Sequence, residues 1–480
     1  MEPITGRSIN VSPSRTERLM VIASAFVVAV MTAAPGAHAK GPDAVSVPDR
    51  PFNMLCIGDS IMWGQGLTDE HKFSARAASW LSQNLRLRDG TPGRPVRRFV
   101  LAHSGAVIAA EDGEDAIIAG PGEVPSSLPS IRNQGLSRAQ GTLAEHQIEA
   151  VDLDLILVDG GANDMNFEAR FLNSDPISWR PGAEEAWVRR WAKAVAVDRM
   201  RGLIADLRTK FPSAKIVIVG YYPIISLASD LPQLSAFLRT LPTAARWLAS
   251  MAIDAIRQDL TNKSNWWVDE TDQGFAQIAS DFSGGHWYGP VAFVPSFFGE
   301  ANAFGAPDTL LWRLGEQDEV FADRAAACSQ AGRSTDLICL NAAVGHPNPH
   351  GADQYAHSII NAIKNNWFNR WSPDRALVLD VTGTVLPGKV VTVNVSATDN
   401  YTGLPADGVT VTWPSHSAGA GPLADMFCTP GQLPPKIRIR PAPSEDAPEA
   451  PEIEFTTCTK LVITAPGYPD VHFDLTKLLP

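Results

Sequence analysis

Short apolar runs of strand length alternate with helical periods over most of the chain. The apolar runs, several of them bounded by Gly, Asp or Ser, are residues 52–57, 98–102, 153–158 and 215–219. Helical spacing appears at 191–211, where Pro212 stops it, and at 355–367, where apolar residues recur four apart. Nearly continuous apolar strands between helices predict a mainly parallel sheet covered on both faces, with ligands bound beyond the carboxyl ends of the strands.

Beyond residue 371 the pattern changes to alternating Val and Thr separated by Gly, Pro and Asp turns. Residues 389–395 and 408–413 show this period of two, which predicts the strands of a β-sandwich. Segments 397–399 and 405–411 resemble those of bacterial immunoglobulin-like modules. A stability or spacing role is favoured for this region over ligand binding.

The N-terminal residues have the pattern of a secretory signal peptide. Three arginines precede an apolar run at 19–34, and Ala37-His38-Ala39 forms a small-residue cleavage signature before Lys40. A membrane anchor is the alternative, but the run is interrupted by polar residues and is shorter than the roughly 20 residues that a span needs. We therefore expect removal near Ala39 and a secreted or periplasmic protein.

The five cysteines agree with an oxidising compartment. Their spacing predicts two local disulfides, Cys328 with Cys339 and Cys428 with Cys458. Cys56 is left over inside an apolar strand, where we expect it to be a buried, unreactive side chain.

Composition and charge narrow the classes of function. Hydrophobic residues make up 45% of the 480 residues, which excludes wholesale disorder. With 40 Lys+Arg against 52 Asp+Glu, the formal net charge is −12, and no dense basic run is present. A nucleic-acid partner is therefore not expected, because such binding needs a basic surface.

Candidate chemistry begins where the first strand ends, in Gly58-Asp59-Ser60. A serine between a strand tip and a helix exposes its hydroxyl above the sheet, and its N–H lies near the positive end of the helix. Alone, this tripeptide is a common turn. It gains weight because two further strands end in groups that can donate hydrogen bonds.

Asn163 follows the strand at 153–158, and Gly105 follows the strand at 98–102. The amide of Asn163 can donate to a developing oxyanion, which a carboxylate cannot do at neutral pH. A glycine lets its backbone N–H approach a ligand closely. His346 precedes the helix at 355–367 and can return to the same sheet edge as a base for Ser60.

At these residues the chain resembles the SGNH family, also called GDSL esterases and lipases. The resemblance covers roughly residues 52–370 and rests on four short blocks in the family's order. These blocks are Gly58-Asp59-Ser60, Gly105, Gly161-x-Asn163-Asp164, and His346-Pro347-Asn348 with Gly351.

The resemblance implies a three-layer α/β/α hydrolase that cleaves carboxylic esters through an acyl-enzyme, without metal or organic cofactor. Ser60 would be the nucleophile and His346 the general base and then acid, with the oxyanion hole formed by Ser60, Gly105 and Asn163. The expected substrate is a small-molecule or lipid ester, and the oligomeric state is left open. Alternatives are a carbohydrate acetyl esterase and a non-catalytic secreted binding or adhesion protein.

Much of the family carries an Asp three residues before the catalytic His, but here that position is Ala343. We expect a backbone carbonyl to accept the Nδ1–H of His346, with Asp336 and Asp353 as the nearest alternative acids. His350 is a weaker candidate base, because the family's glycine follows its histidine by five positions, as Gly351 follows His346. Pro347 and Pro349 argue against a metal pair of His346 and His350, because they forbid the helix that would align them.

The stretch around 225–315 is unusually aromatic and is predicted to be an insertion near the site. If it forms a wall of the cleft, an apolar pocket for medium to long acyl chains is expected; an extra helical subdomain with its own core is the alternative. The predicted division of the chain is 1–39 signal peptide, 40–51 linker, 52–371 hydrolase domain and 372–480 immunoglobulin-like β-sandwich.

Overall fold

The structure is a computed structural model. It describes residues 37–40, 50–87, 89–109, 122–123, 130–165, 182–240, 252–285, 289–372, 377–383, 393–399, 410–412, 438–439, 460–464, 469 and 471–474. The predicted Cys428–Cys458 pair lies outside these residues, as does the apolar run of the predicted signal peptide.

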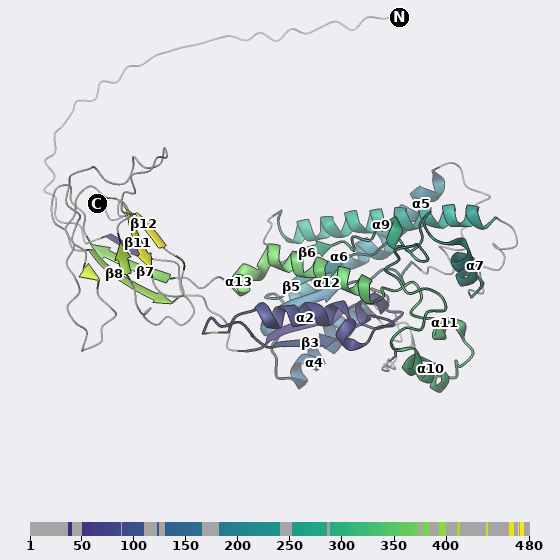
Figure 1. Cartoon of the computed structure of the whole chain (residues 1–480), viewed down its shortest axis with the longest axis horizontal. Coiled ribbons are helices and arrows are strands. Elements are labelled where there is room, and N and C mark those ends of the chain that lie inside the picture. The colour runs from purple at the N-terminus through teal and green to yellow at the C-terminus, as the bar shows by residue number, and fades with distance from the viewer. Residues whose placement is uncertain are drawn as a thin grey trace, which may run out of the picture.

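A parallel sheet forms the centre of the α/β region (Figure 1). In the described part of the chain it has five strands in the order β3-β2-β4-β5-β6. The strands are β2 Phe52–Ile57, β3 Val96–Val100, β4 Leu155–Val158, β5 Lys215–Val219 and β6 Val291–Val294. The four strands predicted from apolar runs are confirmed within two residues. β6 was not predicted, because its short run lies in the stretch expected to be an insertion.

Helices cover the sheet on both faces, as predicted. On one face α2 Phe73–Asn84 and α12 Pro349–Ile363 lie side by side. The other face carries α6 Asp198–Lys210 and the π-helical turn Gln134–Arg138, whose Gly135 fits closely between Leu207 and Ile57. The helical row predicted at 191–211 is α5 Ala183–Ala192, a π-helical turn Lys193–Val197 and α6 in succession.

The shorter helices lie mostly in the connections. They are α1 Ser60–Trp63, α3 Ile131–Asn133, α4 Ala139–Glu145, α7 Leu231–Arg239, α10 Phe321–Gln330, α11 Leu337–Leu340, α13 Asn369–Trp371, the 3₁₀ turns Asp69–His71, Ala150–Asp152 and Glu300–Asn302, and the π-helical turn Lys364–Phe368.

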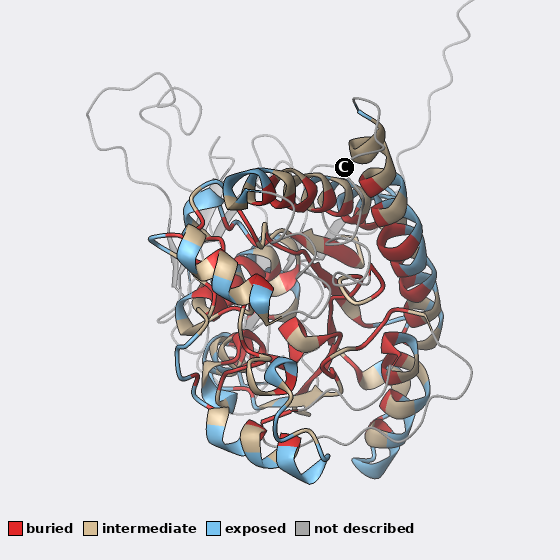
Figure 2. Cartoon of the chain, turned by 90° about the vertical axis from the view of Figure 1, so that its right-hand side faces the viewer, coloured by how far each residue is buried: buried red, intermediate tan, exposed pale blue. Residues whose placement is uncertain are grey.

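The aromatic stretch is partly a regular crossover between β5 and β6. Its main element is the long helix α9, Ile253–Phe282, which packs against α5 and β6. Phe275 and Ile278 of α9 are fully buried, and Figure 2 shows the buried residues in red along the strands and the inner faces of the helices. Part of this stretch therefore belongs to the domain core. No helix of the described residues is long and apolar enough to cross a bilayer.

The strand order predicts where a ligand site lies along the edge of the sheet. The chain passes from β2 to β3 on one side and then crosses back to β4 on the other side, so the direction of strand succession reverses at β2. At such a reversal point the loops after the neighbouring strands separate and leave a crevice at the carboxyl edge of the sheet. Ser60 follows β2 and Asn163 follows β4, so the sequence carries polar groups at this point.

The described C-terminal strands, together with the N-terminal strand β1, form two further small sheets. One has the order β1-β7-β8-β10 and the other β12-β11-β9. The strands are β1 Ala37–Lys40, β7 Leu377–Gly383, β8 Val393–Asp399, β9 Thr410–Thr412, β10 Arg438–Ile439, β11 Lys460–Thr464 and β12 Val471–Asp474. β8 and β9 fall within or beside the two segments predicted from their period of two. Cleavage after Ala39 would remove most of β1, which pairs antiparallel with β7.

Candidate active site

Ser60 stands at the start of α1, directly beyond the tip of β2. Asp59 caps this helix by accepting a hydrogen bond from the N–H of Ile61 at 2.9 Å. Gly58 before it has a φ of 155°, and a Cβ there would lie 1.8 Å from a carboxylate oxygen of Asp159. Only glycine therefore lets the tip of β2 pass so close to the tip of β4.

His346 reaches Ser60 from the loop before α12. Its Nε2 lies 2.7 Å from Oγ of Ser60. The loop is held on both sides, since Gly345 donates to the carbonyl of Trp312 at 3.0 Å and Trp312 donates to the carbonyl of His346 at 2.9 Å. Asn348 then caps α12 by accepting the N–H groups of His350 and Gly351.

The imidazole of His346 is enclosed by this loop, and the loss of water around its charged form lowers its pKa to about 4. The backbone carbonyls of Val344 and Ala343 act in the opposite direction. Nδ1 of His346 makes no hydrogen bond of standard geometry to any described residue. His346 is therefore neutral at physiological pH and can accept a proton from Ser60.

The two alternative acids have other partners. Asp336 caps α11, accepting from the N–H groups of Ile338 and Cys339, and also pairs with Arg333. Asp353 forms an ion pair with Arg76. Neither carboxylate is bonded to the imidazole of His346.

Asn163 is bonded to the residue after Gly105, where the turns after β4 and β3 meet. Nδ2 of Asn163 donates one hydrogen bond to the carbonyl of Ala106 at 2.9 Å, which leaves its second hydrogen for a ligand. Asp164 holds the same turn: its carboxylate accepts the N–H of Ile108 at 2.9 Å and pairs with Arg199 at 2.6 Å. Within the described ranges, the N–H groups of Ser60 and Gly105 have no acceptor.

These side chains and backbone groups face one cavity of about 750 Å³. Ser60, Gly105, Asn163 and His346 all contribute to its lining. Much of the remaining wall is apolar and comes from different parts of the fold: Val107, Met165, Trp191, Val195, Ile224, Phe237, Trp267, Leu337, Ile338 and Val344. The aromatic stretch around 225–315 thus supplies part of the wall as well as part of the core.

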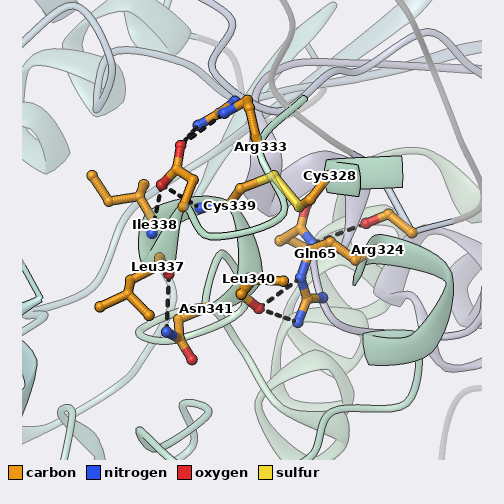
Figure 3. Close-up of a disulfide and its surroundings, with 11 residues drawn as sticks. Gln65, Arg324, Cys328, Arg333, Leu337, Ile338, Cys339, Leu340 and Asn341 are labelled. Carbon is orange, nitrogen blue, oxygen red and sulfur yellow. Dashed lines mark hydrogen bonds and ion pairs between the residues drawn. A yellow bond between two sulfur atoms is a disulfide. The ribbon is translucent and has the colours of Figure 1, made fainter. Parts of the chain in front are cut away.

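One rim of the cavity is the short helix α11. The predicted disulfide Cys328–Cys339 is confirmed and ties α11 to α10, with both sulfurs buried (Figure 3). Leu337 and Ile338 point away from the disulfide and are 51% and 40% exposed. Both line the cavity, so the rim presents apolar side chains to whatever enters.

The other sequence candidates lie away from this contact. His350, the weaker candidate base, is exposed and does not reach Ser60. Cys56 is fully buried, as predicted, and burial raises the pKa of its thiol to about 12. No group of three metal-binding side chains occurs among the residues that the structure describes.

Sequence reasoning missed Tyr221 and Tyr222. They follow β5 at the same edge of the sheet, line the cavity and are buried. The hydroxyl of Tyr221 donates to Asp59 at 2.6 Å, and that of Tyr222 donates to the carbonyl of Gly345 at 2.8 Å. The sequence did contain a signal for them: two tyrosines stand directly after the predicted strand at 215–219, and the ends of parallel strands meet at one edge of the sheet.

Comparison with known proteins agrees with the resemblance. Residues 56–275 match the model of the GDSL-like Lipase/Acylhydrolase family. No curated protein sequence matches the chain.

Solved structures show weaker similarity. A phospholipase A1 from Streptomyces albidoflavus NA297 has 13% identity and a TM-score of 0.36, over 65% of this chain and 98% of that one. An extracellular lipase from Streptomyces rimosus has 12% identity and a TM-score of 0.35, over 65% and 98%. A carbohydrate esterase family 2 enzyme from Corynascus thermopiles has 15% identity and a TM-score of 0.30, over 66% and 67%. TM-scores this low do not indicate which substrate the chain takes. The family match does identify the chain as an ester-hydrolysing enzyme that carries a domain of the GDSL-like lipase/acylhydrolase family.

Proposed function

We propose that this protein is a secreted serine esterase of lipase type, which hydrolyses esters of medium to long acyl chains through an acyl-enzyme on Ser60. The observation that carries the proposal is the 2.7 Å contact between Ser60 and His346 at a largely apolar cavity. In the first step Oγ of Ser60 attacks the ester carbonyl while Nε2 of His346 takes its proton. His346 then gives this proton to the leaving alcohol, and water repeats the sequence to release the acid.

The oxyanion of each tetrahedral intermediate is stabilised by the N–H groups of Ser60 and Gly105 and by the amide of Asn163. All three belong to the lining of the cavity, and donors fixed before the reaction need no reorganisation when charge develops. The backbone of Val344 and Ala343 raises the pKa of His346 against the effect of burial, and we assign these carbonyls the place of a triad acid at Nδ1. A neutral acceptor can hold the tautomer, although it stabilises the imidazolium less than a carboxylate does.

The size and lining of the cavity support a long acyl chain. Its volume of about 750 Å³ lies in the range of pockets that enclose drug-sized ligands. Trp267, Phe237 and Ile224 form an apolar wall, and Leu337 and Ile338 extend it to the rim. These side chains offer apolar contact along a long acyl chain, which an acetyl group is too short to use.

The proposal also includes export of the protein and a supporting role for its C-terminal region. The charged, apolar and small-residue segments before Lys40 support signal-peptide removal, and the Cys328–Cys339 disulfide is typical of an oxidising compartment. Residues 372–480 form an immunoglobulin-like β-sandwich that adds stability or spacing. N-terminal sequencing of the exported protein checks the cleavage site, which is predicted to lie before Lys40.

A series of p-nitrophenyl esters from acetyl to palmitoyl tests the proposed substrate. We expect kcat/KM to rise with chain length beyond acetyl, and Ser60→Ala to abolish turnover of every ester. A strong preference for acetylated sugars over the longer acyl esters would replace the proposal with a carbohydrate esterase.

A further inference from the structure

Tyr221 joins the segments that carry Ser60 and Asn163. Its hydroxyl donates to a carboxylate oxygen of Asp59 at 2.6 Å and accepts the N–H of Ala162 at 3.1 Å. A phenol can do both at once because its oxygen is donor and acceptor. One buried hydroxyl therefore bridges the loops beyond β2 and β4, at the point where the strand order reverses.

Tyr222 makes the equivalent connection to the loop of His346. Its hydroxyl donates to the carbonyl of Gly345 at 2.8 Å, and the residue is 7% exposed. Asp59, Ala162 and Gly345 each precede a proposed catalytic residue by one position. The two phenols thus contact the backbone or side chain next to Ser60, Asn163 and His346.

The backbone that presents the two phenols is itself fixed. The hydroxyl of Tyr355 donates to the carbonyl of Gly220 at 2.8 Å. The ring of Tyr222 stacks on Phe298 with centroids 5.1 Å apart, and Tyr355 packs against both rings. Rings that are held in this way give the hydroxyls defined positions.

The acceptor of Tyr221 is a carboxylate without a counter-ion in the described part of the chain. Asp59 accepts from Tyr221 and Ile61, and its own N–H donates to Asp159 at 2.8 Å. Asp159 is buried, and one of its oxygens has no partner among the described residues. Burial and the nearby Asp59 raise the pKa of Asp159 well above its usual range. Burial also raises the pKa of Asp59 to about 6, so its carboxylate is charged at neutral pH. The charge on Asp59 then strengthens the bond from Tyr221.

We infer that Tyr221 and Tyr222 are positioning residues for the reaction: Tyr221 sets the relation between Ser60 and the oxyanion donor Asn163, and Tyr222 sets the place of His346. This inference rests on the roles proposed above for those three residues. It assigns the tip of β5 a function that the motifs of the sequence do not contain.

Tyr221→Phe tests the first half, because it keeps the ring and removes only the bridging hydroxyl. We expect kcat to fall roughly 10- to 100-fold, since small misplacements of reacting groups have effects of this size, while KM stays within about twofold. The loss should shrink at least threefold when it is measured in the Asn163→Ala background, because residues that act through one another are not additive. Equal losses in both backgrounds, or an unchanged kcat, would overturn the inference.

Tyr222→Phe tests the second half and does not depend on the folding of the Tyr221 variant. We expect kcat to fall while KM stays nearly unchanged, as for Tyr221→Phe. We also expect Ser60 to react more slowly with a fluorophosphonate. Ser358→Ala is the control, because it also loses one buried hydroxyl hydrogen bond, to the carbonyl of Gln354 in its own helix, but lies outside the cavity and the three catalytic segments. A wild-type kcat for Tyr222→Phe, or an equal loss of kcat for Ser358→Ala, would count against positioning.

Failure of the proposed function has a separate signature. If Ser60→Ala and His346→Ala keep their activity, the assignment of the site itself is wrong. If both lose activity and the tyrosine variants keep theirs, only the positioning role is wrong.

Discussion

Oγ of Ser60 lies 2.7 Å from Nε2 of His346, although 286 positions separate the two residues in the chain. The contact exists because β2 ends at the reversal of strand order and the loop before α12 returns to the same edge. The other ring nitrogen of His346, Nδ1, is not bonded to a carboxylate of any described residue. The pair therefore differs from a Ser-His-Asp triad.

The pH dependence follows from this arrangement. Burial lowers the pKa of His346 to about 4, and the ring must be neutral to accept the proton of Ser60. Activity is therefore present above this pKa and lost below it. We expect the acid limb of kcat/KM for a soluble ester to have its midpoint well below the usual histidine value of about 6.5. A midpoint near 7 would indicate a carboxylate on the imidazole, and would contradict a dyad.

Removing the nearest acids should leave turnover intact. Asp336→Asn and Asp353→Asn alter a helix cap and an ion pair with Arg76, neither of which touches His346. We expect kcat within about twofold of wild type for both, and little loss of stability for the cap variant, because Asn caps a helix about as well as Asp. Steady-state kinetics and thermal unfolding check the two parts. A loss of kcat by orders of magnitude in either folded variant would identify that residue as the missing acid.

The rim of the cavity should set acyl preference. Leu337→Ser and Ile338→Ser remove apolar surface at the mouth, where burying such a side chain against substrate is worth about 1.5–3 kcal/mol. We expect kcat/KM for long acyl esters to fall about tenfold or more, and that for acetyl esters to change little. Leu227→Ser is the matched control, because Leu227 is 45% exposed and does not line the cavity. Equal effects at both chain lengths would show that the rim does not bind the acyl chain.

Asp272 provides a stability prediction away from the site. Burial is the main cause that raises the pKa of Asp272 to about 7, and the negative charge of the nearby Asp269 adds to it. The folded state thus binds a proton that the unfolded state releases at about pH 4, so its contribution to stability falls as pH rises from about 4 to 7. Asp272→Asn should raise the free energy of unfolding by about 1–3 kcal/mol at pH 8 and by much less at pH 5. Denaturant titrations at the two pH values check this, and equal changes at both would contradict it.

The sequence predicts most of the sheet, because buried parallel strands appear as continuous apolar runs. β2 and β5 have the predicted bounds, whereas β6 is four residues long and lies among aromatics that were assigned to the pocket. The motifs point to Ser60, Gly105, Asn163 and His346, which the structure brings to one cavity. Tyr221, Tyr222 and the Asp59–Asp159 pair were missed because their roles arise from hydrogen bonds between strand ends far apart in sequence. The disulfide at Cys328 was predictable because its partner is near in sequence.

Covalent labelling tests the central claim most directly. The full chain is treated with a fluorophosphonate, digested and analysed by peptide mass spectrometry, with Ser60→Ala and His346→Ala treated in parallel. We predict one modified residue, Ser60, no label in Ser60→Ala, and much slower labelling in His346→Ala because Oγ has lost its base. Labelling of a different serine, or none in folded wild-type protein that hydrolyses esters, would contradict an acyl-enzyme on Ser60.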